Sequence, residues 1–215
     1  TLTVTDAAIA ITVTADDNSK TYDGTALTDN GWTLSAGTLA TGDYLVVTVE
    51  GTITDAGTEP NVITAVQVMH EAGETDVDVT GNYDITEVDG KLTVNPVTIV
   101  LTADSDSKTY DGTPLTDDGY AITTGVFVGS DGLASVTVAG SQLYVGSSAN
   151  TITAHTLTAE TKASNYSISY LPGTLTVTDA AIAITVTADS DSKTYDGTAL
   201  TDNGWALSAG TLATG

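Results

Sequence analysis

The sequence contains no cysteine and no arginine, and it has only four prolines and two histidines among 215 residues. Without cysteine, no disulfide or thiolate metal site can form, so burial and hydrogen bonding must supply the stability. The chain also lacks a run of about 18 apolar residues and a charged leader followed by an apolar stretch. We therefore predict no membrane insertion in this segment and no signal peptide within it.

Positive charge is scarce. Five lysines stand against 28 acidic residues, which gives a formal net charge of −23. A surface of this kind repels nucleic acid and anionic lipid, so we exclude both as partners. It suits an extracellular polymer and can attract divalent cations. The hydrophobic content of 40% is high enough for packed cores, which argues against general disorder.

The segment Lys-Thr-Tyr-Asp-Gly-Thr occurs three times, at Lys20–Thr25, Lys108–Thr113 and Lys193–Thr198; we call these segments the lysine loops. In addition, Thr174–Gly215 reproduces Thr1–Gly42 with three substitutions. A fixed period of this size indicates a tandem array, here built from pairs of unlike domains. We predict that residues 1–5 close a preceding repeat, 6–95 form the first repeat, 96–179 the second, and 180–215 the start of a third that copies the first.

The residue pattern predicts strands. Threonine, with 43 copies, and valine favour pleated surfaces. Apolar residues alternate with polar ones where each repeat begins, as at Ile9, Ile11 and Val13, which indicates a strand with one buried face. No segment has a 3.6-residue stripe, so short strands and frequent turns predict β-sandwich domains. Further strands are expected at 44–50, 62–70, 83–88 and 91–94 in the first repeat, and at 125–128, 135–138, 143–145, 151–158, 166–170 and 174–178 in the second.

The junctions between repeats are short. Val94 ends one repeat and Val97 opens the next across Asn95-Pro96, with no Gly/Ser linker. The inward-facing positions have even residue numbers before this junction and odd numbers after it. This change moves the buried face to the other side of a continuing strand. We therefore expect stiff joints and a rod-like array.

The chain resembles the YDG/MBG-type tandem repeat domains of bacterial cell-surface and adhesin proteins. The resemblance rests on the lysine loops, on Asn82-Tyr83 and Asn165-Tyr166 near the end of each repeat, and on the closing hairpins 88–94 and 171–177. It covers both complete repeats, although 59–74 does not contribute to it. It implies an all-β module, either an Ig-like β-sandwich or a β-grasp-like variant, strung along secreted or surface proteins. It implies no catalytic residues.

Acidic residues cluster in the turn that precedes each lysine loop. Calcium takes six to eight oxygen ligands, so these carboxylates are candidates for a calcium site, although the spacing is not that of an EF-hand. The alternative is a solvated turn in which each aspartate caps its own backbone. The candidate ligands are Asp16, Asp17, Asp104, Asp106, Asp189 and Asp191.

Three of the five lysines recur at one position of the repeat. Some surface domains join a lysine on an early strand to an asparagine on a late one through an isopeptide bond, which would replace the missing disulfides. The candidate pairs are Lys20 with Asn82 and Lys108 with Asn165. The alternative is an exposed lysine at a strand edge, where its charge discourages aggregation.

Aromatic residues also recur, at Tyr22, Tyr110 and Tyr195 and ten positions later. Aromatics of this kind anchor cores or, when exposed, stack on sugars. The sequence predicts a structural spacer in an extracellular stalk or filament, with further copies of the repeat as partners. The second hypothesis is an adhesin repeat that binds carbohydrate or a surface protein. Lone histidines, the lack of a phosphate loop and the lack of a catalytic cluster argue against an enzyme, and we expect no cofactor other than calcium.

Overall fold

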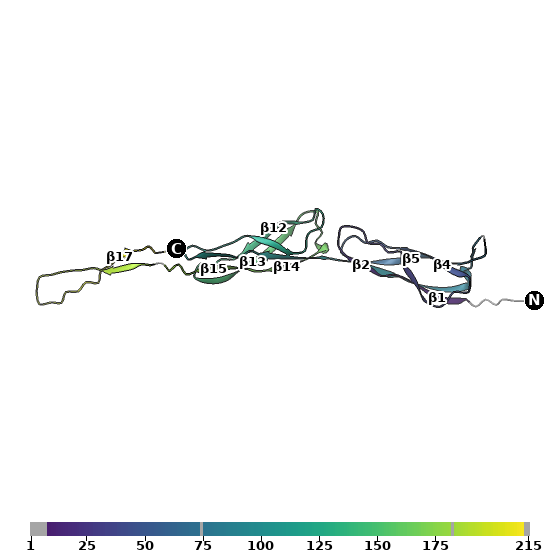
Figure 1. Cartoon of the computed structure of the whole chain (residues 1–215), viewed down its shortest axis with the longest axis horizontal. Helices are drawn as coiled ribbons and strands as arrows, with labels where there is room; N and C mark the ends of the chain where they lie inside the picture. The colour runs from purple at the N-terminus through teal and green to yellow at the C-terminus, as the bar shows by residue number, and fades with distance from the viewer. Residues whose placement is uncertain (1–7, 74, 182, 213–215) are drawn as a thin grey trace, which may run out of the picture. The chain divides into compact units, whose positions relative to one another are not determined.

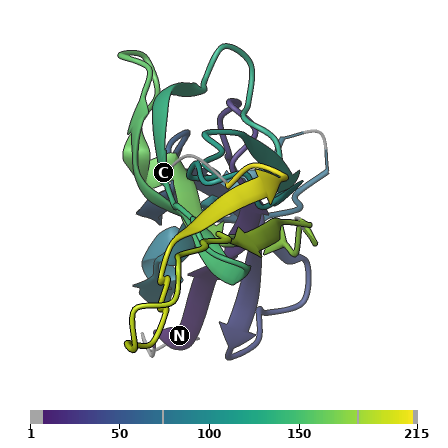
Figure 2. The ribbon, with the colours of Figure 1, turned by 90° about the vertical axis from the view of Figure 1, so that its left-hand side faces the viewer.

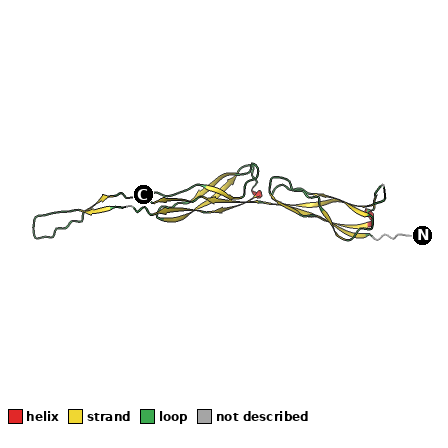
Figure 3. Cartoon of the chain, in the orientation of Figure 1, coloured by secondary structure: helices red, strands yellow, loops and turns green. Residues whose placement is uncertain are grey.

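The computed structural model describes residues 8–73, 75–181 and 183–212. Strands dominate it, and in those ranges the helical segments are two single 3-10 turns, η1 (Thr80–Asn82) and η2 (Ala163–Asn165) (Figure 3). The prediction of an all-β protein is confirmed. The strands of the first repeat are β1 (Ile9–Ala15), β2 (Asn18–Thr21), β3 (Trp32–Ala36), β4 (Asp43–Glu50), β5 (Gly57–His70), β6 (Val77–Asp78), β7 (Tyr83–Val88) and β8 (Gly90–Asn95).

The second repeat contains the strands β9 (Val97–Ala103), β10 (Asp106–Thr109), β11 (Tyr120–Thr124), β12 (Leu133–Ala139), β13 (Gly146–Leu157), β14 (Tyr166–Leu171) and β15 (Gly173–Thr178). The third copy contributes β16 (Thr185–Ala188) and β17 (Trp205–Ala209). Figure 1 labels most of these strands, and Figure 2 shows their twist.

The chain divides into two compact units that do not coincide with the sequence repeats. The first unit comprises Thr1–Val100, Thr124–Ala134 and Thr156–Ser169. The remaining segments form the second unit, from 101 to 123, 135 to 155 and 170 to 215. The first unit therefore combines the first repeat with two segments of the second. The boundaries 6–95, 96–179 and 180–215 stay predictions, and the closing strand expected at 1–5 lies outside the described residues.

Two sheets form the first repeat. One has the order β3-β1-β7, and the other has the order β2-β8-β5-β4 with the short β6 paired to β5. Strand β1 runs antiparallel to β3 and parallel to β7, while β2 runs parallel to β8. The chain thus passes from one sheet to the other at Asp16-Asp17, between β1 and β2.

The core of the first repeat draws on both sheets. Ile11 and Val13 of β1 cluster with Val49 of β4 and with Ile63 and Val68 of β5. Alternation along β1 produces this arrangement, because residues two apart face the same side of a strand. Burial of this apolar surface is the main force that holds the two sheets together.

The second repeat uses the same strand order, with sheets β11-β9-β14 and β10-β15-β13-β12. Ile99 and Leu101 of β9 and Leu175 and Val177 of β15 are buried. The predicted alternation at the start of the second repeat is therefore confirmed.

In the third copy the described strands are the antiparallel pair β16–β17. Ile184 and Val186 are 45% and 55% exposed, whereas their counterparts Ile11 and Val13 are 2% and 0% exposed. The reason is local, because β4 and β5, which cover Ile11 and Val13 in the first repeat, have no counterpart among the described residues 183–212. Ile182, the third-copy counterpart of Ile9, lies outside the described residues.

Two of the expected strands were wrong. At 125–128 the chain forms a loop that begins at Gly125 with a φ of 75°, and Val128 N donates to the Tyr166 hydroxyl instead of to a neighbouring strand. At 143–145 the chain forms a turn, in which Gln142 Nε2 donates to Tyr144 O. Both stretches are apolar, so a period-two reading could not separate an exposed loop from a strand.

Candidate functional site: the lysine loops and their contacts

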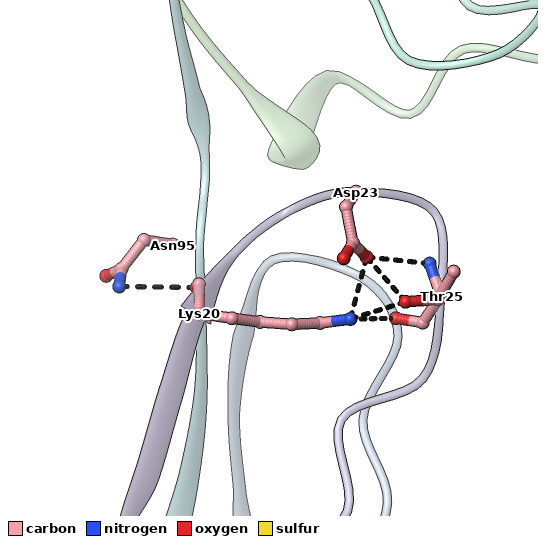
Figure 4. Close-up of polar contacts among 4 residues, drawn as sticks. All are labelled: Lys20, Asp23, Thr25 and Asn95. Atoms are coloured by element: carbon pink, nitrogen blue, oxygen red, sulfur yellow. Dashed lines mark hydrogen bonds and ion pairs between the residues drawn. The ribbon is translucent and has the colours of Figure 1, made fainter.

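Each lysine loop is closed by its own lysine. Lys20 Nζ donates to Asp23 Oδ1 at 2.7 Å, to Thr25 O at 2.6 Å and to Thr25 Oγ1 at 2.8 Å (Figure 4). An ammonium has three donors, and the loop supplies three acceptors. Asn95 Nδ2 donates to Lys20 O at 3.4 Å, which ties the loop to the end of β8. The lysine thus holds a turn in place.

The same geometry recurs in the other two copies. Lys108 Nζ donates to Asp111 Oδ1 and Thr113 Oγ1, both at 2.7 Å. Lys193 Nζ donates to Asp196 Oδ1 at 2.9 Å and also to the hydroxyl of Thr198. The glycine of each loop has a φ near 80°, a left-handed conformation that explains why Gly follows Asp in all three copies.

The aspartate in these loops is held as a carboxylate. Hydrogen bonds from Lys20 and then from the backbone and hydroxyl of Thr25 hold the pKa of Asp23 well below its usual range. The equivalent donors lower the pKa of Asp111 and Asp196 in the same way. The aspartate of each loop therefore stays ionised through the ordinary titration range of aspartate.

A second cluster lies within the first compact unit, where the lysine loop of the first repeat meets segments of the second. The Tyr22 ring packs edge-on against Tyr166, with centroids 5.9 Å apart, and its hydroxyl lies 3.4 Å from Asp131 Oδ2. Tyr166 donates to the same carboxylate oxygen at 2.7 Å and accepts from Val128 N at 2.9 Å. Phe127 packs on Tyr166 at 4.7 Å. Burial raises the pKa of Tyr166 to about 12.

Polar contacts continue this cluster. Lys162 Nζ donates to Asp55 Oδ2 at 2.5 Å, and Asn165 Nδ2 donates to Asp55 Oδ1 at 3.0 Å. The Ala56 N–H donates to Asn165 Oδ1 at 2.7 Å. Hydrogen bonding from Lys162 and then Asn165 lowers the pKa of Asp55. Asn165 is 1% exposed, so its amide is fully used within this contact.

We call this contact the joint. On one side it comprises Tyr22, Asp55 and Ala56, and on the other it comprises Asp131, Lys162, Asn165 and Tyr166. The sequence analysis named Tyr22, Asn165 and Tyr166 for other reasons and did not single out the other members of the joint. A signal was present, because both repeats place an Asn-Tyr pair at the start of a late strand and an Asp at or just before the start of β4 or β12.

The structure does not gather the predicted calcium ligands. The N–H groups of Asp16, Asp104 and Asp189 donate to the carbonyls of Gly31, Gly119 and Gly204. Asp17 Oδ1 accepts from Lys91 N, and Asp106 and Asp191 accept from the backbone of the next residue. Among the described residues, no three His, Cys, Asp or Glu side chains are placed to hold a metal ion.

The isopeptide candidates each have other partners. Lys20 and Lys108 are engaged with the aspartate and threonine of their own loops. Asn165 is engaged with Asp55 and Ala56, and the backbone of Asn82 donates to Val79 O. These four residues thus contact groups other than their candidate isopeptide partners, and the isopeptide bond stays a prediction.

Comparison with known proteins gives no match to a family model, to a curated protein or to a solved structure. In the described part of the chain, none of the helical segments has the length and apolar character needed to span a bilayer.

Proposed function

We propose that this chain is a stiff spacer segment from an extracellular stalk or filament of a surface protein, built from YDG/MBG-type repeats with an Ig-like sandwich fold. The joint is the observation that carries the proposal. It combines an aromatic contact, a buried amide and an ion pair, so bending at this point would break several interactions at once. An array whose members hold one another in this way can be lengthened by adding copies.

The fold also supports this proposal. Each repeat has two sheets, and in the first repeat both sheets contribute to one buried cluster, as in an Ig-like sandwich. A β-grasp domain would pack a helix on its sheet, whereas the described residues provide only single 3-10 turns. The excess of acidic residues keeps such a polymer soluble and prevents lateral association.

The adhesin alternative has one observation in its favour. A recess of about 460 Å³ lies beside the first lysine loop and is lined by Asp17, Asn18, Ser19, Lys91, Thr93 and Asn95. Its lining is polar and contains no aromatic side chain on which a sugar could stack. Trp32 packs against the core instead, so the residue best suited to bind a sugar in the first repeat is used for folding.

Stiffness at the joint can be tested by NMR relaxation of the two repeats. We expect a common rotational correlation time in the native chain and separate, shorter values after Tyr22→Ser combined with Lys162→Ala. Tyr110→Ser is the matched control, because Tyr110 packs in its own repeat as Tyr22 does in the first, against Leu115, Leu175 and Val177. Independent tumbling of the repeats in the native chain would rule out the spacer.

A further inference from the structure

Two large apolar side chains of the second repeat, Tyr144 and Val145, are 70% and 57% exposed. They occupy the positions that carry the joint in the first repeat. In each repeat an isolated bridge, Leu27 to Ile53 or Leu115 to Gln142, is followed by three residues and then by the glycine that begins β5 or β13. Tyr144 therefore corresponds to Asp55, and Val145 corresponds to Ala56.

We call the side of the joint that comprises Asp131, Lys162, Asn165 and Tyr166 the receiving side. It also has a counterpart, in the first repeat. Tyr83 follows η1 as Tyr166 follows η2. Its hydroxyl donates to Asp43 Oδ2 at 2.5 Å and accepts from Ala40 N at 2.9 Å, which repeats the bonds of Tyr166 to Asp131 and Val128. The first repeat thus contains the tyrosine–aspartate hydrogen bond that Tyr22 contacts in the second, with Tyr83 8% exposed and His70 Nδ1 bonded to the other oxygen of Asp43 at 2.6 Å.

One position of the receiving side differs. Val79 immediately precedes η1, where Lys162 precedes η2. The replacement of Lys162 by Val79 on the receiving side matches the replacement of Asp55 by Tyr144 on the other side. Asp55 contacts Lys162, whereas Tyr144 would contact Val79. The asparagine at the end of each turn also fits this comparison. Asn165 is buried in the joint, whereas its counterpart Asn82 is exposed.

We propose that Tyr144, Val145 and the lysine-loop Tyr110 form a docking surface for the Asp43–Tyr83–Val79 face of a first-type repeat placed after the second repeat. This inference rests on the proposed function, since it extends the joint to the other junction of the array. The occupant is thus a module with the sequence of the first repeat. Its start is already present in the chain, as the copy that begins at 180.

The two junctions would then differ in chemistry and enforce alternation of the two repeats. Asp55 placed against Val79 would lose its ionic partner, and Tyr144 placed against Lys162 would leave an ammonium unpaired. Asp55 and Lys162 stay 43% and 65% exposed in the joint, so losing this pair carries a modest penalty, and each docking surface favours its matching receiving side. The two junctions would share the tyrosine–aspartate contacts and differ in one pair of residues, Asp55 with Lys162 or Tyr144 with Val79. This pair would provide the specificity.

The test uses the full chain extended by a second copy of residues 43–95, which completes the third repeat. Hydrogen exchange of the segment 141–146, which occurs once in this chain, is compared with that of the 215-residue protein. We expect exchange at least about tenfold slower in the extended chain. Trp205, now 66% exposed, reports folding of the third repeat, because its counterpart Trp32 packs on a core.

A charge exchange makes the test specific. Lysine at the Val79 counterpart of the appended copy should reduce the protection, and Tyr144→Asp should restore it by recreating the Asp55–Lys162 pair. Val126→Asp is the control, since Val126 is 74% exposed and lies outside the docking surface. Unchanged exchange at 141–146, a Trp205 that stays exposed, or failure of Tyr144→Asp to rescue would overturn the proposal.

The outcome is separable from that of the proposed function. Exchange at 52–57 in the 215-residue chain reports the joint by itself. Protection there without protection at 141–146 would reject only the second docking surface. Rapid exchange at 52–57 would reject the joint and, with it, the spacer.

Discussion

Buried asparagines tie the turns around Asp16 and Asp104 to the sheets in the two repeats. Asn61 and Asn150 are each 0% exposed. Asn61 Nδ2 donates to Asp16 O at 3.0 Å, and Asn150 Nδ2 donates to Asp104 O at 3.0 Å and Asp117 O at 2.9 Å. Asn61 and Asn150 directly precede the expected strands 62–70 and 151–158, where a polar side chain is expected to face solvent.

Asn150→Ala tests this role. We expect a loss of roughly 1–3 kcal/mol in the free energy of unfolding, because buried carbonyls lose their donor. Urea unfolding followed through amide resonances of β13 and β15 measures it. The exposed Asn30→Ala should change stability by less than about 0.5 kcal/mol. Equal effects from the two substitutions would show that the buried amide contributes nothing.

At the scale of elements, alternation predicted the central strands well because each has one buried face. The turn at Asp-Gly was also predictable, since the positive φ of Gly24 and Gly112 requires glycine. The loops were harder to predict. Val126 is 74% exposed and Tyr144 is 70% exposed, so apolar residues lie outside the core in both misassigned stretches. If they serve as contacts between repeats, a pattern read within one repeat cannot reveal it.

The candidate site was predictable only in part, for a related reason. The recurrence of Lys20 and Tyr22 marked the loop, but their partners come from different distances along the chain. Asp23 and Thr25 lie in the same turn, whereas Asp131 and Tyr166 lie more than one repeat away. Contacts of the second kind depend on how segments pack, which local spacing does not encode.

The element around η2 and β14 should be sensitive to alkaline pH. Burial and the Asp131 carboxylate favour the neutral phenol of Tyr166, and they raise its pKa from 10.0 to about 12. A raised folded-state pKa means that this stabilisation is fully present below pH 10.0 and is lost as pH rises toward about 12. Unfolding midpoints across this range, together with tyrosinate absorbance, measure the loss.

Two substitutions separate Tyr166 from the other tyrosines. Tyr166→Phe should remove this part of the alkaline dependence and lower stability at neutral pH, because Val128 N and Asp131 lose a hydrogen-bond partner. Tyr195→Phe should change neither property, since Tyr195 is 92% exposed. An alkaline limb that persists in Tyr166→Phe would assign the effect to Tyr22 or Tyr83, whose pKa values are also raised by burial.

For the whole molecule, self-repulsion should outweigh ion pairing. The chain carries a net charge of −23, whereas the five ion pairs among the described residues involve mostly exposed groups. Exposed pairs are worth little, and salt screens both effects. Sodium chloride raised from about 0.01 M to about 0.1 M shortens the screening length from about 30 Å to about 10 Å. We therefore expect the thermal midpoint to rise, by about 2–4 °C for each kcal/mol gained.

Calcium and magnesium chloride at matched ionic strength then separate screening from binding. Because Asp17, Asp106 and Asp191 of the acidic turns already accept hydrogen bonds from backbone N–H groups, we expect the two salts to raise the thermal midpoint equally. A larger rise with calcium at low concentration, lost in Asp104→Asn or Asp106→Asn, would instead establish the predicted calcium site in those turns. A thermal midpoint that falls with sodium chloride would mean that ion pairs such as Asp55–Lys162 stabilise the fold by more than repulsion within the net charge destabilises it.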